Sequence, residues 1–114
     1  MLSRMVEYPA NGLDATYKAL AHPIRRQMLE RLLGGDQRVT GLAAGFGISL
    51  AAASKHIRVL ENARLVRRTI VGRDHHLALQ VAPLTEAAAW IEWSRRFWEE
   101  RLDALVAVLR EGPE

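Results

Sequence analysis

Residues 39–66, VTGLAAGFGISLAAASKHIRVLENARLV, decide the fold, because they predict two helices joined by a tight turn. Thr40 is a candidate cap for a short first helix. Gly45 and Gly47 lie two residues apart, a spacing typical of a turn in which one residue takes a positive φ. Ser49 is a good N-cap for the second helix. Together these signals indicate a helix-turn-helix.

The second helix of this stretch has two chemically different faces. Its buried stripe is predicted to be Leu50, Ala53, Ile57 and Leu60. Its opposite face is small or cationic: Ala51, Ala52, Ser54, Lys55, Arg58 and Asn62. Small residues allow close approach, while Lys and Arg reach phosphates or guanine edges. We interpret it as a reader helix; the alternative is an ordinary helical hairpin with a solvated basic face.

The hydrophobic period changes after the reader helix. Residues 66–81, VRRTIVGRDHHLALQV, hold β-branched residues, a Gly-Arg-Asp turn and then alternating apolar residues. This pattern predicts a β-hairpin, which is marginal alone and must lean on the helices. Three arginines are expected near one another at a cationic tip: Arg67, Arg68 and Arg73. A basic hairpin directly after a reader helix is typical of the wing of a winged helix.

Charge is segregated along the chain. The net charge is +3, but residues 22–76 hold ten Lys or Arg against four acids, a balance of +6. Residues 77–114 balance at −3 and the first 21 residues at zero. The cationic surplus therefore coincides with the helix-turn-helix and the hairpin, as a nucleic-acid-binding surface requires.

Length and composition indicate one globular domain. The chain has 114 residues, of which 49% are hydrophobic and 25% charged. We expect a winged domain at 13–110, a loose arm at 1–12 with a turn at its end, and a tail at 111–114. The absence of cysteine excludes disulfides and thiolate metal sites. No apolar run is long enough for a membrane span or a secretory signal, so a cytoplasmic location is expected.

Two further helices precede the central stretch and one follows it. Residues 13–21 predict a short helix, and Pro23 opens a second helix that a Gly-Gly pair ends at Gly34. Pro83 opens the last helix, which we expect to run to about Arg110 and to be roughly 42 Å long. The fold class is thus mainly α with a small β-hairpin.

The last helix is apolar on more than one side, which one small domain cannot bury. We therefore predict a homodimer built from this helix and the helix at 13–21. The alternative is a single helix that wraps across its own core. The predicted dimer residues are Leu13, Tyr17, Leu20, Trp90, Ile91, Trp98, Leu102, Leu105 and Leu109.

This order of elements resembles the ArsR/SmtB-type winged-helix regulators over residues 13–109. LDATYKALAHPIRRQMLERL is similar to the opening helices of that family, and ISLAAASKHIRVLENARLV to its reader helix. Ser54, His56 and Ile57 match the family's Ser-x-His-Leu, and Arg73 matches its wing tip. RRFWEERLDAL resembles a cysteine-free branch. The resemblance implies homodimeric transcription regulators, usually repressors, many of which release DNA when an effector binds.

The sequence departs from that family at three points. Arg64 stands where a glycine usually follows the reader helix, so a left-handed residue there would be strained. Ala53 replaces a larger aliphatic residue, which thins the packing of the reader helix. The thiolate ligands of the metal-sensing branch are absent.

Neither a metal site nor an enzyme is expected. His75 and His76 are adjacent strand residues that point to opposite faces, so they cannot share an ion unaided. His56 is predicted to be a hydrogen-bonded structural residue and His22 a helix cap. Ser54 and His56 are two apart on one helix and do not face each other. We expect no cofactor.

The predicted function is sequence-specific binding of duplex DNA at a two-fold-related operator by a homodimeric repressor. The alternative is a winged-helix module that binds protein instead of DNA. The predicted DNA-binding residues are Ser49, Ala51, Ala52, Ser54, Lys55, Arg58, Arg67, Arg68 and Arg73. A small-molecule effector is compatible with the resemblance, but the sequence identifies neither the effector nor the operator.

Overall fold

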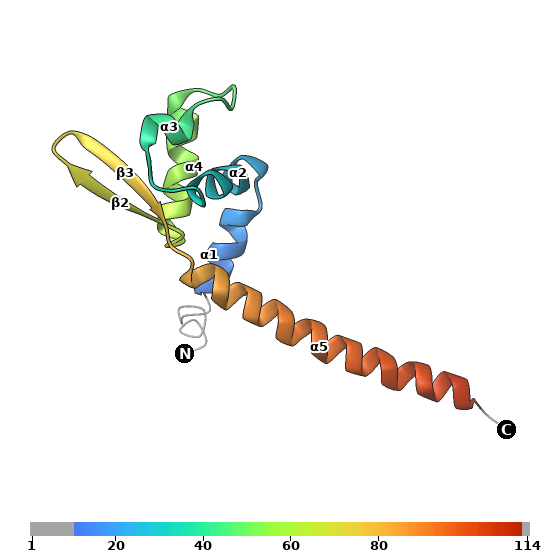
Figure 1. Ribbon diagram of the computed structural model, residues 1–114. Coiled ribbons are helices and arrows are strands. Elements are labelled where there is room, and N and C mark those ends of the chain that lie inside the picture. The colour runs from blue at the N-terminus through green and yellow to red at the C-terminus, as the bar shows by residue number, and fades with distance from the viewer. Residues whose placement is uncertain (1–10, 113–114) are drawn as a thin grey trace, which may run out of the picture.

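The computed structural model describes residues 11–112 and contains five helices and three strands within that range (Figure 1). In chain order they are α1 (Asn11–Leu20), α2 (Pro23–Leu32), β1 (Gln37–Arg38), α3 (Val39–Ala43), α4 (Leu50–Asn62), β2 (Val66–Val71), β3 (Asp74–Leu79) and α5 (Ala82–Glu111). The predicted winged helix-turn-helix with a long C-terminal helix is confirmed.

The boundaries of the domain differ slightly from the prediction. Asn11 and Gly12 begin α1 instead of forming a turn, and Glu111 still belongs to α5. The Thr16 hydroxyl donates to the carbonyl oxygen of Gly12 over 2.9 Å, so the first turn of α1 is tied by a side chain. The remainder of the predicted arm, residues 1–10, and residues 113–114 of the predicted tail lie outside the described residues.

The core lies between α1–α4 and the base of the sheet. Its fully buried hydrophobic side chains come from every layer: Ala19, Met28, Leu42, Ala53, Ile57, Leu60, Leu65 and Leu77. The predicted reader-helix stripe is therefore confirmed at three positions, but the prediction for Leu50 was wrong, because its side chain is 58% exposed. Leu50 has the helical phase of the stripe, yet it is the first residue of α4 and no described element covers that turn.

The turn between α3 and α4 follows the glycines. Gly45 and Gly47 both have positive φ values, 86° and 70°. Ser49 caps α4, because the backbone N–H of Ala52 donates to its Oγ over 3.1 Å. The prediction that Thr40 caps α3 was wrong: α3 begins at Val39 directly after β1, and its N-cap is the extended Arg38, which makes no side-chain cap.

The sheet has three antiparallel strands in the order β1-β3-β2, of which the two-residue β1 was not anticipated. Val66 pairs with Leu79 and Val71 with Asp74, so β2 and β3 form the predicted hairpin. The expectation that all three arginines cluster at its tip was wrong. Arg67 and Arg68 pair with residues near the base, and at about 3.3 Å per residue Arg68 lies roughly 15 Å from the turn.

The reader helix ends in the strained conformation that its sequence predicts. Arg64 follows the C-cap of α4 with a φ of 62°, and it is the one non-glycine residue of the described range with a positive φ. Leu65, the next residue, is fully buried, and its backbone N–H donates to the carbonyl of Leu60 over 3.0 Å. The buried leucine and this bond hold Arg64 left-handed despite its cost.

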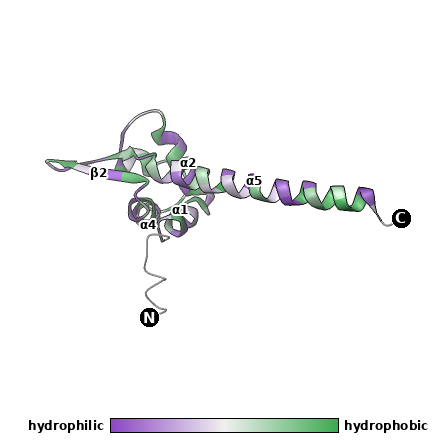
Figure 2. Cartoon of the chain, turned by 90° about the horizontal axis from the view of Figure 1, so that it is seen from below, coloured by the Kyte–Doolittle hydropathy of each residue, from purple (hydrophilic) through white to green (hydrophobic). Residues whose placement is uncertain are grey.

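Helix α5 projects far from the domain. It has 30 residues, about 45 Å of helix, and packs on α1 only through its first turns (Figure 1). The radius of gyration is 19.9 Å, against about 13 Å for a compact chain of this length. Hydrophobic bands continue along the projecting part (Figure 2). The alternative of a helix wrapped across its own core is thus wrong, and among the described residues no helix is long and apolar enough to cross a membrane.

Candidate nucleic-acid interface

The reader helix α4 presents the predicted cationic face to solvent. Lys55 and Arg58 are exposed on the side away from the buried stripe, and Ala51, one turn before Lys55, is exposed as well. Ala52 and Ser54 are partly buried, and Ser49 is exposed although its hydroxyl accepts the capping bond. The structure therefore offers two cations in mid-helix and small residues near the start, with the exposed Leu50 beside them.

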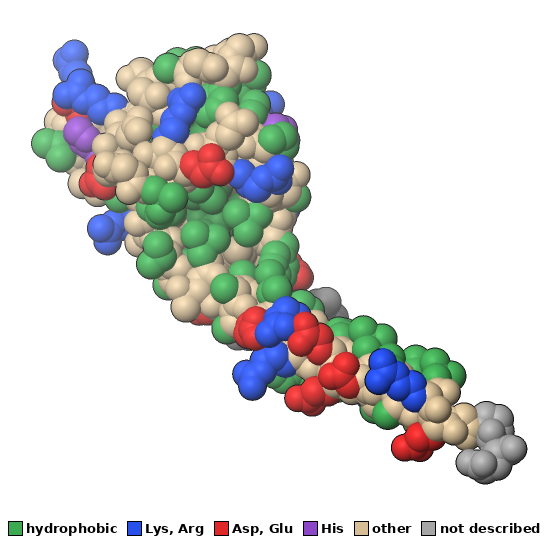
Figure 3. Space-filling model, turned by 45° about the vertical axis from the view of Figure 1, so that its right-hand side comes forward, with side chains coloured by type: hydrophobic (Ala, Val, Ile, Leu, Met, Phe, Trp, Pro, Cys, Tyr) green, Lys and Arg blue, Asp and Glu red, His purple; other side chains and the backbone are tan. Residues whose placement is uncertain are grey.

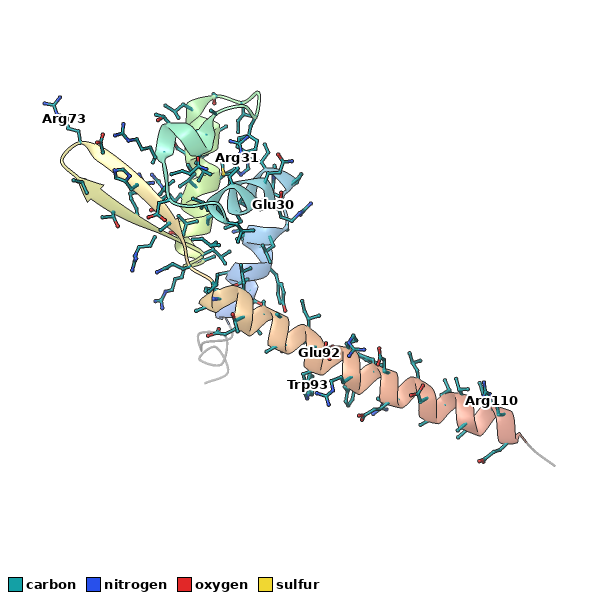
Figure 4. All side chains as sticks on the ribbon, viewed as in Figure 1. Glu30, Arg31, Arg73, Glu92, Trp93 and Arg110 are labelled. Atoms are coloured by element: carbon teal, nitrogen blue, oxygen red, sulfur yellow. The ribbon has the colours of Figure 1, made fainter. Side chains whose placement is uncertain are left out.

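The wing adds exposed cations at two places, its turn and its base. Arg73 lies in the turn between β2 and β3 and extends away from the domain (Figure 4). Arg67 is exposed near the base of the wing. Lys and Arg side chains extend from the wing end of the molecule and hydrophobic side chains gather over the lower domain, while α5 shows acidic and basic side chains together, with hydrophobic ones along one edge (Figure 3). The charge segregation of the sequence is thus also a segregation in space.

Arg68 is occupied within the protein. Its Nε and Nη2 donate to the two carboxylate oxygens of Glu61, each over 2.9 Å, and both side chains are about one quarter exposed. This bond lowers the pKa of Glu61 and raises that of Arg68. The third nitrogen, Nη1, lies 2.9 Å from Nδ1 of His75. Because guanidinium only donates, His75 must accept through Nδ1 and carry its proton on Nε2.

A second ion pair reaches the wing from the entry to the helix-turn-helix. Arg38 of β1 lies 3.3 Å from the carboxylate of Asp74, the first residue of β3. Both side chains are about half exposed, so the pair contributes little stability alone. It nevertheless places an acid beside the wing turn, and this acid partly offsets the charge of Arg73.

His22 and His56 confirm the structural roles predicted for them. Nδ1 of His22 accepts the backbone N–H of Ile24 over 3.1 Å and caps α2. Arg25 donates from Nη1 to Nδ1 of His56 over 3.0 Å, and the two imidazole rings lie 4.4 Å apart. Burial, then the neighbouring His22 and Arg25, lowers the pKa of His56. These contacts join the end of α1 and the start of α2 to the reader helix.

Metal ligands do not gather in the described part of the chain. Residues 11–112 contain no group of three or more His, Asp or Glu side chains placed to share an ion. The Nδ1 atoms of His22, His56 and His75 all accept hydrogen bonds, which leaves one nitrogen on each ring. In the described residues these three imidazoles serve as hydrogen-bond acceptors.

Two contributing residues were missed by sequence reasoning. Arg31 of α2 donates to the carbonyls of Leu42 and Ala44 over 3.2 and 2.7 Å and stacks on Phe46 at 4.1 Å, which holds the helix-turn-helix turn (Figure 4). Glu61 was treated only as a charge to be counted. The seven-residue separation of Glu61 and Arg68 spans the end of a helix and a strand, so no periodic signal connects them.

The predicted dimer residues lie on two neighbouring elements. Those of α1 are partly buried: Leu13, Tyr17 and Leu20. Those of α5 are exposed: Trp90, Ile91, Trp98, Leu102, Leu105 and Leu109. The Tyr17 and Trp90 rings meet edge to face at 6.4 Å, and the Tyr17 hydroxyl donates to the carbonyl of Ala87 over 3.4 Å. The two elements therefore form one continuous surface.

Comparison with known proteins gives consistent findings. The family model described as "Bacterial regulatory protein, arsR family" matches residues 22–68. The chain is 43% identical to the HTH-type transcriptional regulator Rv2034 of Mycobacterium tuberculosis, over 78% of this chain and 80% of that protein. It is 28% identical to the transcriptional repressor SdpR of Bacillus subtilis, over 69% and 88%. The crystal structure of an ArsR family transcriptional regulator has a TM-score of 0.75 and 35% identity, covering 82% of this chain and 95% of that one.

Proposed function

Because this chain belongs to the ArsR family and is a transcriptional regulator, we propose that it is a homodimeric repressor of a two-fold-related duplex-DNA operator. The family consists of regulators, which confirms that the chain is not an enzyme. The observation that carries the DNA-binding proposal is the exposed cationic face of α4 beside a wing with Arg73 at its turn. A protein adaptor would not need both basic elements on one side of the domain.

Each protomer would lay α4 in a major groove. Lys55 and Arg58 would contact phosphates or guanine edges, and Ser54 a phosphate or base edge. Ala51 and Ala52 would meet thymine methyl groups, joined by the exposed Leu50. The predicted contacts of Arg67 and Arg73 with the flanking backbone or minor groove, and of Ser49 with the DNA, remain part of this proposal. A bacterial operator lies in the cytoplasm, where we therefore place the protein.

The dimer proposal rests on surface that one chain leaves exposed. The chain exposes 8500 Å², against about 6,300 Å² for a folded monomer of 12.8 kDa. The excess is about 2,200 Å² per chain and so about 4,400 Å² for two chains, which lies within the roughly 2,000–5,000 Å² that homodimer interfaces bury in total. The projecting helix α5, with its exposed tryptophans and leucines, contributes to this extra exposed area. Helix α1 continues the same surface through the contact of Tyr17 with Trp90.

Binding to duplex DNA at varied salt tests the function. An operator is first selected from a random pool, and wild type is compared with Arg58→Ala, Arg73→Ala and a control, Arg110→Ala, at the far end of α5 (Figure 4). If the dimer neutralises roughly 6–10 phosphates, log K should fall against log salt with a slope of about −5 to −9. Arg73→Ala should weaken all DNA and flatten the slope.

Arg58 should behave differently if it reads a base. Arg58→Ala should then cost about 1–3 kcal/mol at the selected site and relax specificity there. The control should bind as wild type does. Absence of any DNA binding by the wild type at low salt would overturn the proposal in favour of a protein adaptor.

A further inference from the structure

The wing is connected to the reader helix by a side-chain bridge. Glu61 belongs to the last turn of α4, Arg68 to β2 and His75 to β3, so one guanidinium joins three elements. Each nitrogen of Arg68 makes one contact within the protein, Nε and Nη2 with Glu61 and Nη1 with His75, which uses three of its five N–H groups. The guanidinium that sequence reasoning assigned to DNA is therefore engaged in holding the protein together.

This bridge differs from an ordinary surface ion pair. Isolated, exposed pairs contribute little because water screens them and long side chains lose entropy. Here the contact is bidentate, which fixes direction as well as distance, and both side chains are about three quarters buried. Beyond the level of β1, whose two residues pair with Leu77 and His76 of β3, the wing is a two-stranded ribbon, and such a ribbon is marginal by itself. A rigid contact at the base consequently controls where the tip, roughly 15 Å away, is held.

We propose that Glu61 and Arg68 are positioning residues that set the angle of the wing against the reader helix, so that Arg73 meets the DNA backbone in register with Lys55 and Arg58. The inference rests on the proposed DNA-binding function. It removes Arg68 from the DNA-contacting set and gives Glu61, an acid on a basic face, a reason to be there. His75 supports the same guanidinium from the opposite strand.

The two readings of Arg68 predict effects of opposite sign for Glu61→Gln. If Arg68 contacts phosphate, removal of Glu61's charge frees the guanidinium and lessens repulsion of DNA, so binding strengthens. If Arg68 positions the wing, the same substitution loosens the bridge, and operator binding weakens by about tenfold, as for coupled residues in one network. Arg68→Lys also distinguishes the two roles. Lysine still binds phosphate as a point charge, but it cannot make the bidentate contact with Glu61.

The test measures operator affinity and salt slope for wild type, Glu61→Gln, Arg68→Lys and Arg73→Ala. Glu30→Gln, which removes an acid from α2 away from the wing, is the matched control (Figure 4). We expect both bridge variants to bind about tenfold more weakly and the control to bind as tightly as wild type or slightly tighter. In the Arg73→Ala background Glu61→Gln should cost less than about twofold, because the wing contact it would misplace is already gone.

Circular dichroism at the assay temperature identifies variants that remain folded. Arg68→Lys retains the charge and most of the side chain, so it serves if Glu61→Gln does not fold. Equal or tighter operator binding by a folded Glu61→Gln or Arg68→Lys would overturn the positioning role. Additive losses in the Arg73→Ala background would overturn it as well. Failure of the wild type to bind any duplex would instead reject the function itself, so the two failures are distinguishable.

Discussion

Replacing Leu102 and Leu105 of α5 with aspartate should convert the protein to monomers. The two side chains are 56% and 53% exposed in a single chain, although they belong to the apolar surface assigned to the partner. Full burial of a leucine stabilises by about 1.5–3 kcal/mol, so burying the exposed half contributes roughly 0.8–1.5 kcal/mol. A two-fold dimer contains four such leucines, which together contribute about 3–6 kcal/mol.

The substitution therefore raises the dissociation constant by about 10²- to 10⁴-fold, since each 1.4 kcal/mol is tenfold. Four carboxylates that must lose water on association increase the penalty further. The assay is sedimentation velocity from submicromolar to 100-micromolar concentrations, expected to show a dimer for wild type and one chain for the variant. Helical content at the same concentrations shows whether the monomer keeps its fold.

Leu33→Asp is the matched control for this experiment. Leu33 is 71% exposed at the C-terminal cap of α2, away from α1 and α5, so the same substitution there should leave the mass unchanged. A wild-type mass of one chain throughout the range would refute the dimer, and a dimeric double variant would refute the assignment of the surface.

Three further predictions concern stability and ligands. Arg64→Gly should raise the free energy of unfolding by about 1 kcal/mol in urea titrations, because glycine adopts a φ of 62° without strain. Because the pKa of His56 is lowered in the folded protein, its neutral ring stabilises the fold fully above pH 6.5, the ordinary pKa of histidine. This stabilisation decreases as the pH falls through the lowered pKa of the folded state. His56→Gln should therefore make the urea midpoint depend less on pH below pH 6.5. Zinc should neither bind tightly nor release DNA in calorimetric and DNA-binding titrations, and stoichiometric binding abolished by His75→Ala would contradict our interpretation of the wing.

Local signals determine most of the fold and were readable in the sequence. Ser49, the two glycines of the turn and the proline at the start of α2 each act within a few residues, so their consequences do not depend on distant contacts. Arg64 is only partly local. It stands where a glycine usually follows the reader helix and its φ is positive, but the burial of Leu65 helps to hold that conformation.

The errors occur where tertiary context overrides the local pattern. Leu50 fits the buried phase of α4, but periodicity does not say where the covering elements end, and its side chain is exposed. Strand β1 has only two residues, which is too short for an alternating pattern, and its pairing with β3 shifts the start of α3 and leaves Thr40 inside the helix. Such a short strand forms because β3 is available to pair with it, and not because of its own sequence pattern.

Residue type alone predicts the site, and strand register shows which of its arginines is paired within the protein. In sequence, an arginine in a basic stretch is equally compatible with a DNA contact and with an ion pair within the protein. The residue that lies next to it in the folded structure distinguishes the two. The pairing of β2 with β3 and the last turn of α4 bring Glu61 to Arg68, while Arg67, one position earlier, points to the other face and remains exposed. The two adjacent arginines are therefore in different environments because they lie on opposite faces of β2.

In the proposed dimer, the distance between the two reader helices would depend on how the α5 helices pair, because α4 connects to the proposed dimer surface through the α1–α5 contact. Arg95 interrupts the apolar surface of α5 and is bound by Glu92 and Glu99 of its own helix, which raises its pKa. A partner helix would thus meet a guanidinium that is already paired with two carboxylates. The cost in binding free energy is smallest if solvent or polar atoms of the partner lie against it. One polar position in an apolar seam favours a single register over its shifted alternatives. Since half-sites must lie about one helical turn apart or a multiple of it, a single register of α5 also selects a single operator spacing.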